Sequence, residues 1–448
     1  MHRREAVAAI LAAPLAGIRA ISARQASDLT ALSIAQAAAA LAAGKFTALD
    51  LANAYLARID RLNPDLHAYI TVTRELARRE AESAKSSGLM NGIPIAHKDL
   101  FETRGVRTTA GSLLFEHHTP DTNAAVVQQL EGAGAVMLGK TNTHELGGGV
   151  TTINPFFGTT RNPVDRTRIP GGSSGGSAAA VVAQMCAAAT GSDTGGSVRI
   201  PAAFCGCVGF KPTHGRISTR GLIAASPTFD HAGFLTRTVE DAQIIFGVFD
   251  NSRAQQLPSP IRVGVPKNYV FEGVDDSVAR AFTRGIDLLG ERGARIVSTT
   301  LPIDARTMSR VFDPIFMFEL WHRFGADWRT DPGLFSEEFS AVFAIERPSV
   351  VEYETALAAL KEYQAAIDTL FDSVDAIATP TVPLTAPPIT GRIDGMRILR
   401  NTWPFNAAGT PAISVPVARE PLPIGMQLIG RRNADHKLLQ VARLLDPH

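Results

Sequence analysis

The chain has 448 residues, of which 45% are hydrophobic and 19% charged, a composition typical of a globular protein with a sizeable buried core. Its 44 lysines and arginines balance 43 acidic residues, so a net charge of +1 gives no electrostatic reason to expect nucleic acid or an acidic membrane surface as a partner. The three cysteines make no disulfide framework and no Cys/His cluster has the spacing of a zinc site, and we expect neither a metal nor a cofactor.

The first 25 residues have the character of a targeting segment. Met1-His2-Arg3-Arg4 precedes an apolar run over residues 6–18, and Ala20-Ile21-Ser22-Ala23 follows it. This pattern is typical of a secretory signal, including the twin-arginine kind, and also fits an alanine-rich amphipathic helix that leads into the fold. A signal peptide over residues 1–23 would predict export to the periplasm, and its absence would predict a cytoplasmic protein. Neither this run nor any other segment is long and apolar enough to span a bilayer, so we expect no stable membrane insertion.

Helical and strand patterns alternate along the rest of the chain. From Leu32 to about Leu62 apolar residues recur at helical spacing, and Gly44 and Thr47 divide this pattern into two helices. The further predicted helices lie at 75–87, 124–132, 177–183 and 278–291, and the predicted strands at 93–96, 135–139 and 261–265. Residues 254–260 carry two prolines and favour a surface connection. The alternation predicts an α/β fold, and no shift in composition divides residues 26–448 into separate domains.

Aromatic residues crowd the segment 312–343. We expect most of them to belong to the core, as aromatic side chains at helical spacing usually do, and some to line an apolar substrate pocket. The residues are Phe312, Phe316, Phe318, Trp321, Phe324, Trp328, Phe335, Phe339 and Phe343.

Two glycine-rich stretches and one lysine carry the chemistry that the sequence suggests. The stretches are Gly171-Gly172-Ser173-Ser174-Gly175-Gly176-Ser177 and Gly191-Ser192-Asp193-Thr194-Gly195-Gly196-Ser197-Val198-Arg199-Ile200-Pro201, and Lys98 follows the strand predicted at 93–96. A serine hydroxyl needs a base to become a nucleophile, and no histidine stands in a recognisable triad context. Lysine can be that base when burial favours its neutral amine. Because an exposed lysine, with a pKa of about 10.4, is almost wholly protonated at neutral pH, this interpretation requires a buried Lys98.

The glycines before Ser197 allow a sharp turn of the backbone. Gly195 and Gly196 bring N–H groups close to a reacting carbonyl, and the amides from Thr194 to Ser197 are candidates for an oxyanion hole. Asp193 and Arg199 flank the turn with opposite charges and can hold it by hydrogen bonds.

These residues together resemble the amidase signature family. The segment from Gly171 to Ala202 has the run Gly-Gly-Ser-Ser-Gly-Gly, then Gly-x-Asp-x-Gly-Gly-Ser-Val-Arg-x-Pro, and the similarity covers about residues 30 to 445. Other landmarks are Lys98-Asp99, Lys140-Thr141-Asn142, Asp230-His231-Ala232-Gly233 and Pro404-Phe405-Asn406-Ala407-Ala408-Gly409. The resemblance implies one large α/β domain over residues 26–448, in which α-helices surround a mixed, twisted β-sheet.

The resemblance also implies a role for each residue of the motif. Ser197 would be the acyl nucleophile, Lys98 the base, and Ser173, following a cis peptide bond, the serine that bridges them. The oxyanion hole would consist of the backbone amides of Thr194, Gly195, Gly196 and Ser197. The supporting residues would be Ser174, Asp193 and Arg199. The implied activity is hydrolysis of a carboxylic amide C–N bond through an acyl-enzyme.

The expected substrate is a small amide with a hydrophobic or aryl acyl group. Gly147, Gly148 and Gly149 occupy a segment that borders the acyl pocket in relatives, and they leave room for a bulky group. Leu100 and Phe101 either make the pocket entrance more apolar or repack in the core. Aryl esters, anilides and carbamates (urethanes) present the same acyl carbonyl and are candidate further substrates. We expect a monomer or a homodimer.

Three other interpretations compete with this one. In an α/β-hydrolase, Gly172-Ser173-Ser174-Gly175-Gly176 would be the nucleophile elbow with Ser174 as nucleophile, but a polar loop stands where that motif needs a strand. The glutaminase subunit of a tRNA-dependent amidotransferase shares the signature, but an exported chain could not serve in one. A non-enzymatic binding scaffold is disfavoured because all three catalytic positions are filled.

Overall fold

The computed structural model describes residues 29–84, 88–223, 225–250, 252 and 257–446. The segment at 1–25 lies outside the described residues, as does the first part of the connection predicted at 254–260. The strands are β1 (Tyr69–Val72), β2 (Pro94–Lys98), β3 (Val136–Thr141), β4 (Ala188–Asp193), β5 (Val208–Lys211), β6 (His231–Thr236), β7 (Arg262–Pro266), β8 (Arg295–Thr299), β9 (Ala376–Pro380), β10 (Ala412–Ala418) and β11 (Ile424–Ile429).

These strands form one eleven-stranded sheet in the order β1-β3-β2-β4-β6-β5-β10-β11-β9-β7-β8. β2 runs parallel to β3 and β4, and β7 runs parallel to β8 and β9. The remaining pairs are antiparallel, so the sheet is mixed, as expected. β6 pairs with both β4 and β5, and Ala412 at the start of β10 pairs with Lys211 at the end of β5. One edge of the sheet therefore collects the ends of β4 and β5 and the start of β10.

Helices surround this sheet, which makes the fold a single α/β domain. They are α2 (Ile34–Ala42), α3 (Ala48–Leu66), α4 (Arg74–Ser83), α5 (Ala125–Gly132), α6 (Gly175–Val182), α7 (Arg199–Cys205), α8 (Val239–Phe249), α9 (Asp276–Glu291), α10 (Ala305–Thr330), α11 (Glu337–Phe343), α12 (Val350–Leu370), α13 (Gly395–Leu399), α14 (Trp403–Ala407) and α15 (Asp435–Ala442). Short 3-10 turns are η1 (Leu113–Phe115), η2 (Glu145–Gly147) and η3 (Pro332–Leu334).

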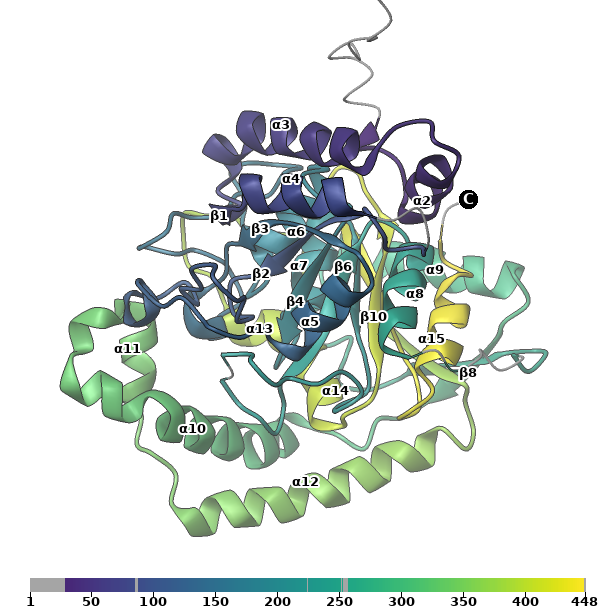
Figure 1. The fold of residues 1–448 in the computed structure, drawn as a ribbon. Coiled ribbons are helices and arrows are strands. Elements are labelled where there is room, and N and C mark those ends of the chain that lie inside the picture. The colour runs from purple at the N-terminus through teal and green to yellow at the C-terminus, as the bar shows by residue number, and fades with distance from the viewer. Residues whose placement is uncertain (1–28, 85–87, 224, 251, 253–256, 447–448) are drawn as a thin grey trace, which may run out of the picture.

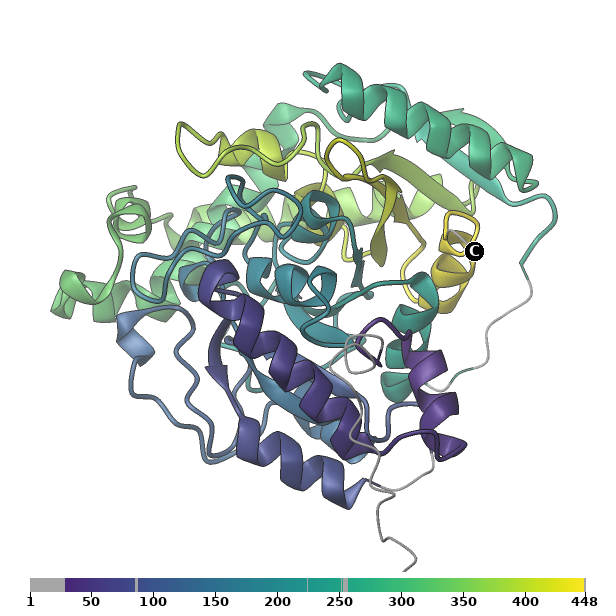
Figure 2. The same ribbon diagram turned by 90° about the horizontal axis from the view of Figure 1, so that it is seen from above.

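Two groups of helices lie on opposite sides of the molecule. Figure 1 shows α3 and α4 together on one side, and α10, α11 and α12 extended along the other. Seen from above in Figure 2, α3 and α4 run side by side across the front of the molecule. The catalytic motif lies between these groups, because α6 and α7 pack against the central strands.

The local signals in the sequence account for the ends of several elements. Thr47 begins α3: its hydroxyl accepts the N–H of Asp50 at 3.0 Å, and the Asp50 carboxylate accepts the N–H of Thr47 at 2.9 Å. This capping box stabilises the first turn, and the separation of two helices at Gly44 and Thr47 is confirmed. Leu51, Tyr55 and Ile59 then fall on one buried face of α3.

The aromatic segment forms α10, η3 and α11. Trp321, Phe324, Phe335, Phe339 and Phe343 pack together in a buried cluster. The cluster also includes Leu100 and Leu146, which belong to loops next to the catalytic motif. The expectation that most of these aromatic side chains are core is confirmed, and their packing ties the α10–α11 segment to those loops.

Candidate active site

Lys98 is the last residue of β2, and its side chain is fully buried. Its Nζ donates hydrogen bonds to Ser173 Oγ at 2.6 Å and to Ser192 Oγ at 2.7 Å. Burial lowers the pKa of Lys98 to about 7, although the carboxylates of Asp193 and Asp230 oppose the shift. A large share of the amine is therefore neutral near physiological pH, which is the state that a base requires.

Ser173 faces this lysine from a loop whose main chain is held on both sides. The Gly172–Ser173 peptide bond is cis. The Ser173 carbonyl accepts hydrogen bonds from the N–H of His144 and the hydroxyl of Thr143, each at 3.0 Å. These bonds fix the backbone and leave the hydroxyl directed at Lys98.

Ser174 joins the two serine-bearing loops. Its N–H donates to the carbonyl of Ser197 at 3.2 Å, and its hydroxyl donates to the carbonyl of Ser192 at 3.2 Å. No strand precedes Ser174 in the described stretch 160–174, apart from an isolated bridge at Arg168. The strand that an α/β-hydrolase elbow requires is therefore missing there, and the Ser174 hydroxyl is engaged with backbone.

The turn at residues 194–197 connects the end of β4 to the start of α7. Gly196 has a φ of 141°, and a Cβ atom placed on it would lie 2.2 Å from Thr402 Oγ1, so only glycine fits. The Thr402 hydroxyl donates to the carbonyl of Gly195 at 2.6 Å and holds the turn from outside. Ser197 follows this turn with 5% of its side chain exposed.

A buried ion pair supports the turn from below. The Arg199 guanidinium donates to both carboxylate oxygens of Asp193, at 3.0 Å and 2.8 Å, and Asn406 donates to the same carboxylate at 2.8 Å. Burial alone would raise the pKa of Asp193, but the Arg199 charge and these hydrogen bonds hold it well below its usual value. The carboxylate also accepts the N–H of Val198 at 3.1 Å, so the ion pair fixes the backbone immediately after Ser197.

Thr194 is fixed by a second carboxylate. Its hydroxyl donates to Asp230, which also accepts the N–H of Ser226 at 2.9 Å. Burial raises the pKa of Asp230 to about 6, and the bond from Thr194 opposes that rise. The side chain of Thr194 is thus held away from the turn, leaving its amide as part of the backbone of residues 194–197.

The three glycines at 147–149 have different surroundings. A Cβ atom on Gly147 would lie 3.7 Å from Ser173 Oγ and 3.1 Å from Leu100 Cδ1. A Cβ on Gly148 would lie 2.4 Å from the Phe339 ring, and one on Gly149 would lie 2.3 Å from the His144 ring. The space beside Gly148 and Gly149 is therefore filled by rings, and Gly147 borders the bridging serine. Of the two residues after Lys98-Asp99, Phe101 packs in the main core and Leu100 lines this side of the site.

The side of the turn away from Lys98 is apolar. A Cβ atom on Gly195 would meet Leu399 at 3.0 Å and Phe312 and Trp403 at 3.8 Å. Phe312 comes from α10, while Leu399 and Trp403 come from α13 and α14. We call Phe312, Leu399 and Trp403 the apolar wall. It brings side chains from two distant parts of the sequence to within one side-chain layer of the oxyanion turn.

Sequence reasoning missed Ser192 and Thr402. A signal for Ser192 exists, because alternate residues of a strand face the same side. Thr190 and Ser192 of β4 both bond to Lys98: Thr190 Oγ1 accepts its backbone N–H at 3.2 Å. Thr402 lies more than 200 residues from the turn that it holds, and no local pattern predicts that contact.

The histidines do other work. Burial, and then the charge of Lys140, lower the pKa of His97 to about 3; burial, and then Lys98, lower that of His144 to about 4. Among the hydrogen bonds of the described residues, none joins a histidine ring to Ser173, Ser174 or Ser197. The lysine is thus the basic group in contact with the serine pair.

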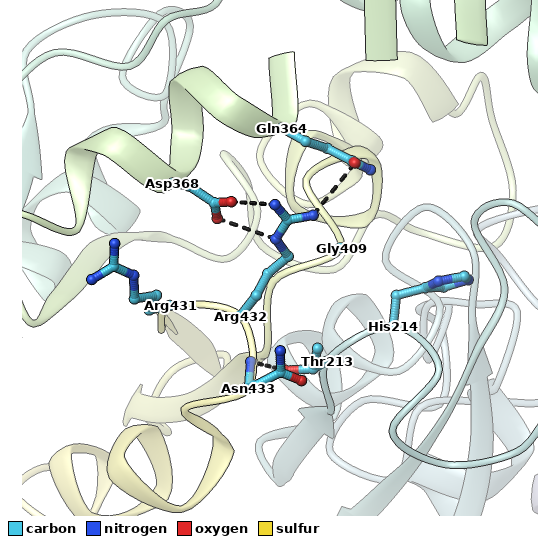
Figure 3. A pocket seen from close by; sticks show the side chains of 8 residues that line it. All are labelled: Thr213, His214, Gln364, Asp368, Gly409, Arg431, Arg432 and Asn433. Atoms are coloured by element: carbon cyan, nitrogen blue, oxygen red, sulfur yellow. Dashed lines mark hydrogen bonds and ion pairs between the residues drawn. The ribbon is translucent and has the colours of Figure 1, made fainter. Parts of the chain in front are cut away.

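A polar cavity of about 490 Å³ lies further along the same sheet edge (Figure 3). Its two arginines are already paired: Arg432 with Asp368 and Gln364, and Arg431 with Asp372 at 2.9 Å. The Thr213 hydroxyl accepts the N–H of Asn433 at 2.9 Å. This cavity therefore offers few free charges, and none of Lys98, Ser173 and Ser197 lines it.

Neither a metal site nor a membrane span is found in the part of the chain that the structure describes. No group of three or more His, Cys, Asp and Glu side chains there could hold a metal ion. Among the same residues, no helix has the length and apolarity needed to cross a membrane.

Known proteins resemble this chain over nearly its whole length. It is 36% identical over 472 aligned residues to the A-type subunit of the Glutamyl-tRNA(Gln) amidotransferase of Chloroflexus aggregans, covering 93% of this chain and 96% of that protein. The crystal structure of an amidase superposes with a TM-score of 0.86 at 32% identity, covering 92% of this chain and 99% of that one. The structure of the corresponding Glutamyl-tRNA(Gln) amidotransferase subunit from Thermotoga maritima gives a TM-score of 0.76 at 33% identity, covering 93% and 94%. Since a sequence model of the amidase family also matches residues 50–439, the chain belongs to the amidase signature family.

Proposed function

We propose that this protein hydrolyses the C–N bond of a small carboxylic amide with an apolar acyl group, through an acyl-enzyme on Ser197. The observation that carries the proposal is the buried Lys98, whose Nζ lies 2.6 Å from Ser173 Oγ and whose pKa burial lowers to about 7. A neutral amine at this distance can take the proton that a serine nucleophile must lose.

The first half of the proposed reaction forms the acyl-enzyme. Ser197 Oγ attacks the carbonyl carbon, its proton passes to Ser173 Oγ, and the Ser173 proton passes to Lys98 Nζ. The carbonyl oxygen becomes an oxyanion, and the backbone N–H groups of residues 194–197 stabilise it. When the tetrahedral intermediate collapses, the C–N bond breaks and the leaving nitrogen takes the proton back through Ser173.

The second half returns the enzyme to its starting state. A water molecule loses a proton along the same path and attacks the acyl ester. The C–O bond to Ser197 then breaks, Ser197 Oγ regains a proton, and the carboxylic acid leaves. The hydrogen bond from Lys98 to Ser192 at 2.7 Å keeps the amine in place through both halves.

The apolar wall supports the choice of substrate. Phe312, Leu399 and Trp403 lie beside Gly195, and Leu100 lies beside Gly147. Such side chains favour an acyl group that carries hydrocarbon or aryl surface, because burying that surface contributes about 25 cal/mol per Å². Aryl esters and carbamates present the same carbonyl and are included in the proposal as further substrates.

Active-site labelling and the Ser197→Ala variant test the proposal. A fluorophosphonate should label Ser197 in the full chain, and Ser197→Ala should lower kcat on an aryl anilide by about 10⁴-fold or more. Ser174→Ala is the matched control, because Ser174 is a neighbouring buried serine that the proposal does not use as nucleophile. Labelling of Ser174 and full activity of Ser197→Ala would overturn the assignment.

The second candidate function is that of a glutaminase subunit in a tRNA-dependent amidotransferase. It is supported by relatives that are named as amidotransferase subunits, such as the protein of Chloroflexus aggregans. A free glutamine carries an ammonium and a carboxylate that need charged partners, whereas the side chains beside Gly195 and Gly147 are apolar. Comparing kcat/KM for glutamine, aliphatic amides, anilides and carbamates separates the candidates, since a preference for glutamine would establish the second.

Export would also separate them. We retain the proposal that residues 1–25 are a targeting segment and that residues 26–448 are the amidase domain. N-terminal sequencing of the protein from periplasm and cytoplasm tests it: a cleaved periplasmic form excludes the amidotransferase role, and an intact cytoplasmic form removes the targeting segment.

A further inference from the structure

A cavity of about 530 Å³ lies beside the apolar wall. Trp403 belongs to both: it lines the cavity, and its Cβ atom lies 3.8 Å from the Cβ position of Gly195 in the oxyanion turn. Phe312 of the wall precedes Asp313, which also lines the cavity. One layer of side chains therefore separates the cavity from the turn, and a substrate held at Ser197 could extend into it.

Most charged side chains that line the cavity are already engaged. Arg400 pairs with Glu272, and its guanidinium lies 4.4 Å from the centre of the Tyr269 ring. Arg397 pairs with Asp275 at 2.6 Å. The Asp394 carboxylate accepts the N–H of Arg397 at 3.0 Å and caps α13. These pairs leave little free positive charge for an anionic ligand.

Asp313 is the exception among them. It is half-buried, and it makes no hydrogen bond or ion pair with any other described residue. Burial raises the pKa of Asp313 to about 6, so the carboxylate is ionised yet unpaired above that pH. A partly buried charge without a partner is unfavourable, and a cation in the cavity would remove that cost.

The rings around Asp313 suit the same kind of ligand. Trp403 donates its indole N–H to the Tyr269 hydroxyl at 3.1 Å, which fixes both rings. Aromatic faces attract ammonium and guanidinium groups, as Arg400 on Tyr269 already shows within this cavity. A carboxylate beside fixed aromatic surface is the chemistry that recognises an organic ammonium ion.

We propose that this cavity binds an alkylammonium group of the amide substrate, with Asp313 as its counter-ion. The inference rests on the proposed amide hydrolysis, because it names a second part of the same substrate. Such a substrate has an apolar stretch between the scissile amide and a primary amine. The stretch contacts Phe312, Leu399 and Trp403, and the ammonium reaches Asp313.

Matched substrates test this directly. One series consists of p-nitroanilides whose acyl chains of graded length end in methyl, ammonium or carboxylate, and a parallel series carries the same end groups on the amine side. At a pH above 7, the best ammonium substrate of one series should exceed its methyl counterpart by about tenfold in kcat/KM. Asp313→Asn should remove that preference and leave the methyl substrates within about threefold of wild type.

Asp394→Asn is the control, because it removes a charge from the same cavity while asparagine still caps α13. It should keep the preference for ammonium. The proposal is overturned if neither series prefers ammonium, if the preference survives Asp313→Asn, or if carboxylate is the preferred end group. Circular dichroism melting of both variants identifies any loss caused by misfolding.

A binding measurement separates this inference from the proposed function. By calorimetry, n-hexylammonium should bind the wild-type protein about tenfold more tightly than n-hexanol, and Asp313→Asn should abolish the difference. If hexylammonium binds in this way but no amide is hydrolysed, the proposed function fails and the cavity assignment stands. If amides are hydrolysed but the two probes bind equally, the cavity assignment fails alone.

Discussion

At the scale of single residues, Lys98 combines full burial with two hydroxyl partners. The strand that carries it is buried along its whole length, and the amine reaches only Ser173 and Ser192 among the described hydrogen bonds of its side chain. Water is therefore unavailable to stabilise the ammonium, which is why its pKa falls. The same burial that makes Lys98 a base makes it a source of instability when it is protonated.

The rate should follow the titration of Lys98. Because the neutral amine is the reactive form, kcat/KM for a neutral anilide should fall about tenfold for each pH unit below the pKa of about 7 and level off above it. A pH–rate profile of the wild-type protein checks this. A profile without an inflection near neutral pH would remove Lys98 as the base.

Stability should respond to Lys98 with a defined sign. The folded pKa of about 7 lies below the ordinary value of 10.5, so the cost of burying the amine is fully present below pH 7 and disappears as the pH rises through 10.5. Lys98→Met should therefore raise the free energy of unfolding at neutral pH by about 1–3 kcal/mol, with a smaller gain at alkaline pH, while abolishing activity. Denaturant unfolding at a series of pH values measures the effect; a gain that grows with pH would contradict it.

The ion pair of Asp193 and Arg199 should behave as a buried unit. Both side chains are fully buried, so Asp193→Ala leaves an unpaired guanidinium and should cost about 3–5 kcal/mol. The comparison is Glu75→Ala, which breaks an exposed pair with Arg78 and should cost less than about 1 kcal/mol. Urea unfolding of both variants gives the two values, and equal values would show that the buried pair has no special role.

At the scale of elements, the catalytic loops and the α10–α11 segment are packed into one another. Phe339 of α11 fills the space beside Gly148, and Ser336 donates its N–H to the buried carboxylate of Glu145 at 3.0 Å. Glu145 in turn accepts the Ser112 hydroxyl at 2.7 Å. The position of α11 is thus coupled to the loop that ends at Gly147, beside Ser173.

Gly148→Ala should therefore disturb the site from outside. The added methyl would meet the Phe339 ring at 2.4 Å, so α11 or the loop must move, and we expect kcat/KM to fall about tenfold or more. Gly290→Ala in α9 is the control, because nothing lies within 4 Å of its Cβ position and alanine favours the helix by about 0.5–1 kcal/mol. Kinetics and thermal melting of both variants are the measurement; wild-type kinetics of Gly148→Ala would show that the loop tolerates displacement of Phe339.

At the scale of the whole molecule, the sheet joins the two ends of the chain. The late strands β10 and β11 lie in the middle of the sheet, between β5 on one side and β9 on the other. Removing either half would expose a sheet edge, and unpaired backbone groups at such an edge are unfavourable when buried. The fold therefore has no boundary at which one half could detach.

Unfolding should accordingly be cooperative. The tryptophans Trp321, Trp328 and Trp403 all lie on α10 and α14, whereas far-UV circular dichroism reports on the whole chain. We expect the two signals to change with the same midpoint in urea. An earlier loss of the fluorescence signal would show instead that the α10–α14 region unfolds separately.

The sequence by itself determined the local elements and the residues that bear the chemistry. Helical periodicity and the Thr47 cap located α2 and α3, and the spacing of the glycine-rich stretches singled out Ser173, Ser197 and Lys98. These features are readable because period, capping and turn chemistry act over a few neighbouring residues. The tertiary structure alone decided how deeply Lys98 is buried, that Thr402 holds the turn, and that Phe339 and His144 fill the space beside Gly148 and Gly149. Those outcomes depend on contacts between segments as much as 200 residues apart, and no local pattern encodes which distant side chain will pack at a given site.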